Sequence, residues 1–238
     1  MTLESILATL PANSSVWPPS PTSAWGKAGN PVGNFGELDR FNAPLAARYG
    51  AYASAPDYLA KAAAASIEGH KAFVEGYSLR KDSAALRSTG FVQWMLNNDA
   101  PSNIWHFFHS DLTVGSAGAG AKQALAAPLH IALRPTDLSV ALINALYVAQ
   151  PEAPGLVAGV EVFSLADETT FSATAPVAVG SVAADGVATL AALQLPPAVA
   201  GGGAYFARLT LTRGAELVES NTYWLPEVQD VIDWSKST

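Results

Sequence analysis

The stretch Thr89-Gly90-Phe91-Val92-Gln93-Trp94-Met95-Leu96-Asn97-Asn98-Asp99-Ala100-Pro101-Ser102 decides how the first half of the chain is interpreted. A largely apolar run, 91–96, follows a glycine and ends in turn-forming residues, which predicts a short strand buried on both faces. Such strands are typical of parallel sheets in α/β folds, where ligands bind beyond the carboxyl ends of the strands. Trp94, Asn97 and Asn98 are therefore the first candidates for a ligand site. A core tryptophan followed by an ordinary turn fits the same residues, and composition alone favours that interpretation.

Two helices are expected before this strand. The first spans 36–49 and is closed by Gly50, and the second begins after Ser54, with Pro56 in its first turn and Asp57 at the acidic position of a capping box. Residues on one face of the second helix recur at helical spacing: Leu59, Ala63, Ser66, His70, Phe73 and Tyr77. We expect His70 to be a packing residue. The preceding segment, 11–36, is rich in proline and glycine and reads as a loop held by Trp17 and Trp25.

From Pro128 onward the apolar residues recur with a period of two. Strands are expected at Leu129–Leu133, Leu138–Asn144, Gly155–Leu165, Thr170–Val179, Val187–Leu195, Ala204–Thr212 and Glu216–Leu225. In the clearest of these, Tyr205, Ala207, Leu209 and Leu211 should point inward and Phe206, Arg208, Thr210 and Thr212 outward. Many short strands in about 100 residues predict an antiparallel β-sandwich of immunoglobulin-like size.

Composition limits the classes of function. The chain has 238 residues, half of them hydrophobic, and a net charge of −7 with 13 scattered basic residues, which argues against nucleic-acid binding. No apolar run is long enough to span a membrane, and the N-terminus lacks the basic and apolar regions of a signal peptide. The absence of cysteine excludes disulfides and thiolate sites but leaves the compartment open.

Few motifs carry chemistry by themselves. His106 and His109, three residues apart beside Asp111, are the one candidate metal group, and we expect surface or packing histidines there and no metal or cofactor. No Gly-x-Ser-x-Gly motif occurs. Glycoside hydrolysis needs a pair of carboxylates, and in the first 125 residues only Asp99 follows an evident strand. No catalytic residue is therefore assigned.

A set of motifs resembles glycoside hydrolase family 2 enzymes of the exo-β-D-glucosaminidase type, with plant endo-β-mannosidases and β-mannosidases similar at the first of them. These motifs are Thr89-Gly90…Trp94-Met-Leu-Asn-Asn98-x-x-Pro101-Ser102…Trp105, Arg48-Tyr49-Gly50-Ala, Asp57-Tyr58-Leu-x-Lys61-Ala62, Gly120-Ala121-Lys122-x-Ala124…Pro128-Leu129-His130-Ile131, Asn221-x-Tyr223-Trp224-Leu225 and Asp233-Trp234-Ser235-Lys236-Ser237-Thr238. They follow the family's order nearly from end to end of the chain.

The resemblance implies an α+β chain, with a partial (β/α)8 barrel remnant, mainly α, over 1–125. An immunoglobulin-like antiparallel β-sandwich over 126–225 and a linker or tail over 226–238 would follow. Trp94 would be the stacking platform at the cleaved sugar, and Asn97 and Asn98 would bond sugar hydroxyls or the catalytic carboxylates. The family's two catalytic glutamates lie on barrel strands that precede the matched region. The chain departs from the family's pattern at Gln93, Ala100 and Gly118-Ala119, where the family often has aromatics, and the loss of aromatics around a sugar site weakens stacking.

Three hypotheses follow from the sequence. The preferred one is a fragment of a retaining glycosidase that acts on β-linked glucosaminyl or mannosyl residues, inactive alone for want of both glutamates. Its partner would be a chitosan- or mannan-type oligosaccharide once the barrel is completed. The second is a carbohydrate-binding sandwich, which needs surface aromatics such as Phe206, Trp224 and Tyr147 on one face. The third is an interaction domain whose exposed barrel edges lead to self-association. Family members are often secreted, but the N-terminus here has no signal-peptide pattern, so the compartment is not assigned.

Overall fold

The structure, a computed structural model, describes residues 3–15, 17–19, 38–99, 106–150, 155–164, 170–192, 203–226 and 230–236. The chain divides into two compact units. The first combines Met1–Phe73 with Val92–Gln123, and the second combines Val74–Phe91 with Ala124–Thr238. The boundaries expected from the sequence, 1–125, 126–225 and 226–238, stay a prediction.

The helices are α1 (Leu3–Thr9), α3 (Leu38–Tyr49), α4 (Ala55–Ser78) and α5 (Ser116–Leu125), with a 3-10 turn, η2, at Trp234–Lys236. Gly50 ends α3 with a φ of 78°, a conformation that glycine adopts without strain. At the start of α4 the Asp57 amide donates to Ser54 Oγ (3.4 Å), and the Ala53 amide donates to Asp57 Oδ2 (2.9 Å). These bonds resemble the predicted capping box, but the Asp57 carboxylate accepts from the amide before the cap residue Ser54 and not from that of Ser54 itself. The bond from Ala53, together with Lys61, holds the pKa of Asp57 below its ordinary value.

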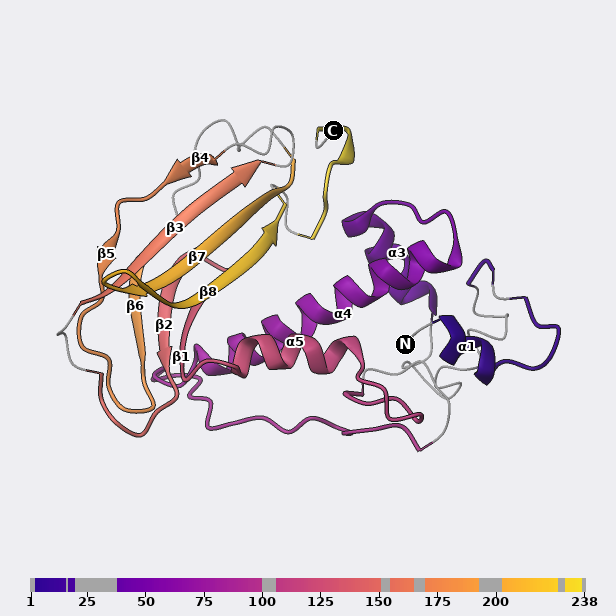
Figure 1. The fold of residues 1–238 in the computed structure, drawn as a ribbon, viewed down its shortest axis with the longest axis horizontal. Helices are drawn as coiled ribbons and strands as arrows, with labels where there is room; N and C mark the ends of the chain where they lie inside the picture. The colour runs from indigo at the N-terminus through magenta and orange to yellow at the C-terminus, as the bar shows by residue number, and fades with distance from the viewer. Residues whose placement is uncertain are drawn as a thin grey trace. The chain divides into compact units, whose positions relative to one another are not determined.

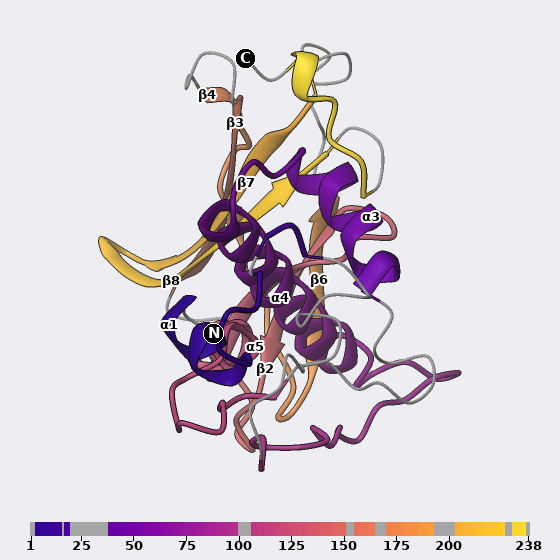
Figure 2. The ribbon, with the colours of Figure 1, turned by 90° about the vertical axis from the view of Figure 1, so that its right-hand side faces the viewer.

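Polar contacts and a glycine hold the helices of the first unit together. Arg48 on α3 donates to Glu68 on α4 from both Nε (2.9 Å) and Nη2 (3.2 Å), and the Tyr58 hydroxyl on α4 donates to Asn42 on α3 (2.8 Å). Figures 1 and 2 both show α5 running alongside α4. The two helices can approach closely because Gly120 has no side chain: a Cβ there would lie 2.2 Å from the Ile67 carbonyl oxygen.

Two antiparallel sheets form most of the second unit. A three-stranded sheet has the order β1 (Leu129–Leu133), β2 (Ser139–Asn144), β6 (Val187–Ala192). A five-stranded sheet has the order β4 (Thr170–Ala173), β3 (Leu156–Ser164), β7 (Tyr205–Arg213), β8 (Glu216–Leu225), with β5 (Val177–Ala178) also paired to β3. The two layers can be followed in Figure 1, and the strands lie close to the predicted ranges.

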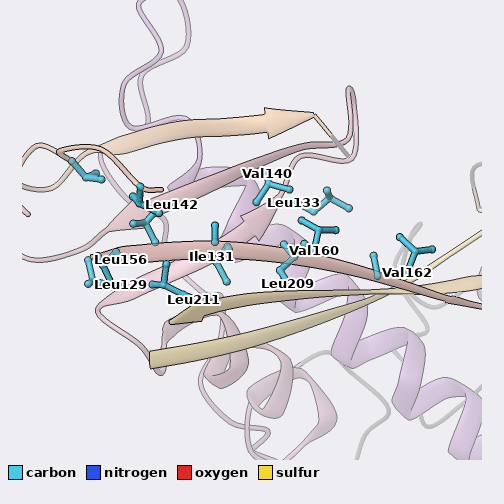
Figure 3. Close-up of a cluster of buried hydrophobic side chains, with 14 of the residues drawn as sticks. Leu129, Ile131, Leu133, Val140, Leu142, Leu156, Val160, Val162, Leu209 and Leu211 are labelled. Carbon is cyan, nitrogen blue, oxygen red and sulfur yellow. The ribbon is translucent and has the colours of Figure 1, made fainter. Parts of the chain in front are cut away.

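One hydrophobic core lies between the two sheets (Figure 3). Ile131 and Leu142 from the smaller sheet and Leu209 and Leu211 from the larger one are fully buried in it. From Tyr205 to Thr212 of β7, side chains at odd-numbered positions are buried and those at even-numbered positions are more exposed, so the predicted alternation is confirmed. Apolar side chains at every second position therefore determine which face of each strand points inward.

The outer face of the three-stranded sheet is also covered, which the alternation did not predict. Leu79, just after α4, packs on Ala132, Ala141 and Ile143. Asp82 accepts a hydrogen bond from the Val187 amide (2.7 Å) in the same region. Because of this cover, every residue of β1 and β2 is buried.

The segment after β8 packs on the sandwich through apolar side chains. Ile232 is buried, and the Trp234 ring meets the Trp224 ring edge to face, with centroids 5.8 Å apart. The Ser235 amide and hydroxyl both donate to Asp233 Oδ1, which closes the short turn η2. Ile232 and Trp234 therefore attach this segment to the second unit.

The apolar stripe predicted on α4 is wrong in its second half. Phe73 and Tyr77 are exposed, and the buried side chains there are Lys71, Val74 and Glu75. The reason is that this end of the helix turns a polar face inward, where Glu75 finds partners that helical periodicity does not reveal.

The coarse prediction of an α+β chain with helices followed by antiparallel sheets is confirmed, and the barrel and immunoglobulin-like assignments stay predictions. Within the described ranges, no helix combines the length and apolar character needed to cross a bilayer.

Candidate functional site

The segment that carries Trp94 is extended but exposed. Val92 is 87% exposed, Trp94 75% and Leu96 59%, and the peptide between Trp94 and Met95 is cis. The prediction of a strand buried on both faces is therefore wrong for this structure. The physical reason is that burial requires a neighbouring strand on each side, whereas the described residues give this segment one bridge, between Asn97 and Phe108.

The two asparagines differ in exposure. The Asn98 side chain is 3% exposed, and its backbone amide donates to the Phe108 carbonyl (3.2 Å). The Phe108 amide in turn donates to the Leu96 carbonyl (3.0 Å), so this loop fixes the end of the segment. Asn97 is exposed, and its amide donates to the Asn98 carbonyl (3.2 Å). Trp94 and Asn97 thus face solvent near one another in the chain, while Asn98 points into the unit.

The histidines of the following loop are buried. His106 is 4% and His109 7% exposed, and burial lowers the pKa of both imidazoles below the ordinary value. Asp111 accepts hydrogen bonds from the amide (3.0 Å) and hydroxyl (2.6 Å) of Thr113, as in a turn. In the described part of the chain, no three His, Asp or Glu side chains gather as metal ligands. Trp105 and Trp25, two aromatics singled out in the sequence, lie outside the described residues.

A pair of carboxylates that sequence reasoning missed lies in the second unit. Glu75 from the end of α4 and Glu219 from β8 flank His130 of β1. His130 Nε2 lies 2.9 Å from Glu75 Oε1, and His130 Nδ1 lies 2.5 Å from Glu219 Oε1. The Glu75 and His130 side chains are each 4% exposed, and the Glu219 side chain is 11% exposed.

This pair does not have the features of a glycosidase acid and nucleophile. Glu75 Oε2 accepts from the Tyr223 hydroxyl (2.9 Å), and Glu219 Oε2 accepts from the Ile131 amide (2.6 Å), so every carboxylate oxygen already has a donor. A catalytic pair must leave room for a sugar between its carboxyl groups. One feature of the sequence could have indicated this cluster: polar side chains occupy three alternate positions of β8, namely Glu219, Asn221 and Tyr223.

The surface aromatics of the sandwich are partly covered by the chain itself. Phe163, Phe206 and Trp224 are cross-strand neighbours in register on one face of the larger sheet. The Arg208 guanidinium lies 5.0 Å from the centroid of the Phe163 ring, and Trp234 meets Trp224. Tyr147 is 87% exposed but belongs to the loop after β2. The aromatics do not make one open platform.

Comparison with known proteins identifies the relatives of the chain. No family model matches it. It is 37% identical over 209 residues to an exo-β-D-glucosaminidase of Streptomyces avermitilis, and 32% identical over 206 residues to the one from Amycolatopsis orientalis. These matches cover 87% and 85% of the chain. This chain is homologous to exo-β-D-glucosaminidases of glycoside hydrolase family 2.

Solved structures lead to the same relatives. The structure of an exo-β-D-glucosaminidase, described for its inhibition by a glucosamine-configured castanospermine and an amino-australine analogue, matches 94% of the chain with a TM-score of 0.81 and 29% identity. The exo-chitosanase of Amycolatopsis orientalis matches 89% with a TM-score of 0.77 and 30% identity. The chain spans about a fifth of the curated relatives, 22% and 19% of their lengths, and about a quarter of these two solved chains, 26% and 24%.

Proposed function

We propose that this chain forms the end of the catalytic barrel and the following immunoglobulin-like sandwich of an exo-β-D-glucosaminidase, with Trp94 as the platform for the glucosaminyl ring. The observation that carries the proposal is Trp94 itself: a chain homologous to glucosaminidases leaves this tryptophan 75% exposed within an extended, largely apolar segment. An indole face offers the flat apolar surface on which the C–H face of a sugar stacks.

The exposed apolar segment fits a barrel strand whose neighbours are absent from the described residues. Val92 and Leu96 expose large apolar side chains that a soluble protein normally covers. In a closed (β/α)8 barrel these side chains pack against adjacent strands and surrounding helices. On this basis Phe91–Asn97 is the last barrel strand, and the residues after it lie on the catalytic face.

The two asparagines receive separate roles under this proposal. Asn97, which is exposed, bonds a hydroxyl of the sugar or a catalytic carboxylate. Asn98, which is buried and bonded through its backbone to Phe108, holds the strand end in place. The residue that positions the strand end and the residue that contacts the substrate would then be neighbours in the sequence.

The proposed ligand is a glucosamine oligomer, and its hydrolysis requires residues that this chain does not supply. The relatives are named exo-β-D-glucosaminidase and exo-chitosanase, so a β-linked glucosaminyl oligomer is the proposed ligand; the comparisons give no support to a mannan-type ligand or to self-association. The carboxylate pair that retaining hydrolysis requires is proposed to come from outside this chain. We therefore expect the 238-residue chain alone not to hydrolyse p-nitrophenyl β-D-glucosaminide.

A chimera tests the proposal. The matched quarter of the Amycolatopsis orientalis enzyme is replaced by this chain, and hydrolysis of p-nitrophenyl β-D-glucosaminide is measured. We expect activity, and a decrease in kcat/KM of about 10- to 100-fold for Trp94→Ala, since loss of a stacking platform removes about 1–3 kcal/mol. Tyr147→Ala, which removes an exposed aromatic from the sandwich, should leave kcat/KM unchanged. A folded chimera that loses nothing on Trp94→Ala would show that Trp94 is not the platform.

Carbohydrate binding by the sandwich is the alternative hypothesis from the sequence, and the partly covered aromatics of the larger sheet count against it. It predicts binding of glucosamine oligomers by the isolated chain that depends on Phe206 and Trp224 and is indifferent to Trp94. Calorimetric titration of the Trp94→Ala and Trp224→Ala variants with a glucosamine oligomer separates the two candidates.

A further inference from the structure

The cluster around His130 joins three elements of the second unit that are far apart in sequence. Glu75 belongs to α4, His130 to β1 and Glu219 to β8, and each carboxylate contacts a different ring nitrogen of the same imidazole. An imidazole can give a hydrogen bond from both nitrogens only when it is protonated. The geometry therefore favours a positively charged ring held between two carboxylates.

The same cluster also satisfies the open edge of β1. Among the described residues this strand pairs with β2 alone, so the backbone groups on its other side need other partners. Three side chains of β8 provide them: Glu219 accepts from the Ile131 amide (2.6 Å), Asn221 donates to the Ile131 carbonyl (2.8 Å), and the Tyr223 hydroxyl accepts from the Leu133 amide (3.0 Å). Side chains of β8 thus take the place of a backbone ladder along this edge of the sandwich.

Glu75 connects the helix to this arrangement. Its Oε1 accepts from Asn221 (3.0 Å) as well as contacting His130, and its Oε2 accepts from Tyr223. The adjoining Leu79 covers the apolar outer face of the same sheet. Loss of the charge on His130 would therefore weaken the contact of β1 with both the helix end and β8.

We propose that Glu75, His130 and Glu219 form a proton-dependent latch, which fastens the last turns of α4 and the strand β8 to the edge of β1 while His130 is protonated and loosens when the proton is lost. Deprotonation leaves one N–H on the ring, so one of the two carboxylates loses its donor and keeps its charge in a buried place. The latch is a device of the fold and does not depend on the proposed glycosidase activity.

The groups in contact with His130 agree with this behaviour. Burial by itself lowers the pKa of an imidazole, but the hydrogen bonds and charges of Glu219 and Glu75 outweigh it and raise the pKa of His130 to about 9. The titratable groups that face the cluster are Glu75 from α4 and Glu219 and Tyr223 from β8. Burial, with Glu75 nearby, raises the pKa of the Tyr223 phenol well above its ordinary value, so the phenol stays neutral while His130 titrates.

Histidine NMR on the whole chain tests the latch, because the sequence has only four histidines. Imidazole resonances are followed from about pH 5 to pH 10.5, and His70→Gln, His106→Gln and His109→Gln assign the other three, so that His130 is identified without being altered. We expect His130 to keep its proton to above about pH 8, against an ordinary midpoint of about 6.5. The backbone amides of Ile131 and Leu133 should shift with the same midpoint, since their acceptors belong to the cluster.

Variants separate a latch from a merely buried histidine. Glu75→Gln and Glu219→Gln should each lower the His130 midpoint by about one unit or more, whereas Glu161→Gln, which removes a carboxylate paired with Arg208 at the surface, should leave it unchanged. A His130 midpoint below about 8, or amides of Ile131 and Leu133 that do not follow His130, would overturn the proposal. So would a midpoint that neither of the two cluster variants moves.

Discussion

Because Gly120 of α5 has no side chain, α5 can lie directly against the backbone of α4. A Cβ at this position would lie 2.2 Å from the Ile67 carbonyl oxygen and 2.9 Å from its carbonyl carbon, and both atoms are backbone. Backbone cannot rotate away as the tip of a long side chain can, so the helix α5 would have to move. We expect Gly120→Ala to destabilise the chain by about 1–3 kcal/mol, and a lower midpoint in thermal unfolding checks this.

Gly69 is the matched control for that substitution. It also lies in a helix, α4, but a Cβ there would meet nothing within 4 Å. Gly69→Ala should therefore stabilise the chain by about 0.5–1 kcal/mol, because alanine restricts the unfolded chain and glycine does not. Equal effects of the two substitutions would mean that Gly120 is not a packing position.

Residue-level prediction from the sequence succeeded where the cause is local. Gly50 and Asp57 have the conformation and bonds that helix-end chemistry assigns to them, since the residues involved lie within a few positions of each other. The burial of Asn98 and the partners of His130 could not be predicted in this way. Both depend on residues many positions away in the sequence: Phe108 for the first, and Glu75 and Glu219 for the second.

At the scale of elements, the hairpin of β7 and β8 provides a test of where the core lies. Leu209 is fully buried between the sheets, whereas Leu217 on the paired strand is 59% exposed. We expect Leu209→Ala to cost about 2–5 kcal/mol of unfolding free energy and Leu217→Ala less than about 1 kcal/mol. Denaturant unfolding of the two variants measures the difference, and similar midpoints would contradict the assignment of the inner face.

The strands and the segment around Trp94 show what limits prediction at this scale. A period of two was enough to place the strands of the sandwich, because each has its partners within the described chain. Residues 91–96 carry a pattern just as apolar, yet Val92 and Trp94 are exposed. The pattern indicates that a strand requires burial, but only the neighbouring strands can provide it. The candidate site was predicted from the same pattern, but the exposure of its residues could not be predicted from it.

For the molecule as a whole, His130 makes stability depend on pH in a defined direction. Its pKa of about 9 in the folded chain exceeds the value of about 6.5 expected for the unfolded chain, so the folded state binds the proton more tightly. The resulting stabilisation is complete below about pH 6.5 and is lost as the pH rises through about 9, at about 1.4 kcal/mol per unit of pKa difference.

Thermal unfolding between about pH 6 and pH 10 checks this direction. The midpoint should fall on the alkaline side in the wild-type chain, and by less in Glu219→Gln, in which His130 has lost one of its two carboxylates. The surface variant Glu161→Gln should behave like wild type. A wild-type midpoint that stays level across this interval would contradict the linkage.

The compact unit that contains the sheets also includes a segment that precedes the sandwich in the sequence, and the contribution of this segment can be measured. Val74–Phe91 belongs to the same compact unit as the sheets, because Glu75 bonds His130 and Leu79 covers Ile143. A fragment of residues 126–238 keeps the sheets but leaves His130 and an apolar sheet face without this cover. We therefore expect such a fragment to be less stable than the sandwich in the whole chain, and to be stabilised by adding a peptide of residues 72–91.

The added peptide should raise the thermal midpoint with concentration, by the equivalent of about 2.7 kcal/mol when it is present at 100 times its dissociation constant. A peptide with Glu75→Gln and Leu79→Ala is the matched control, since it keeps the length and the other side chains but loses the hydrogen-bonded carboxylate and the apolar cover. If neither peptide changes the thermal midpoint of the fragment, the end of α4 does not belong to the folding unit of the sandwich. If both peptides act equally, the segment binds, but through neither Glu75 nor Leu79, and the stability of the sandwich then does not rest on the contacts that these two residues make.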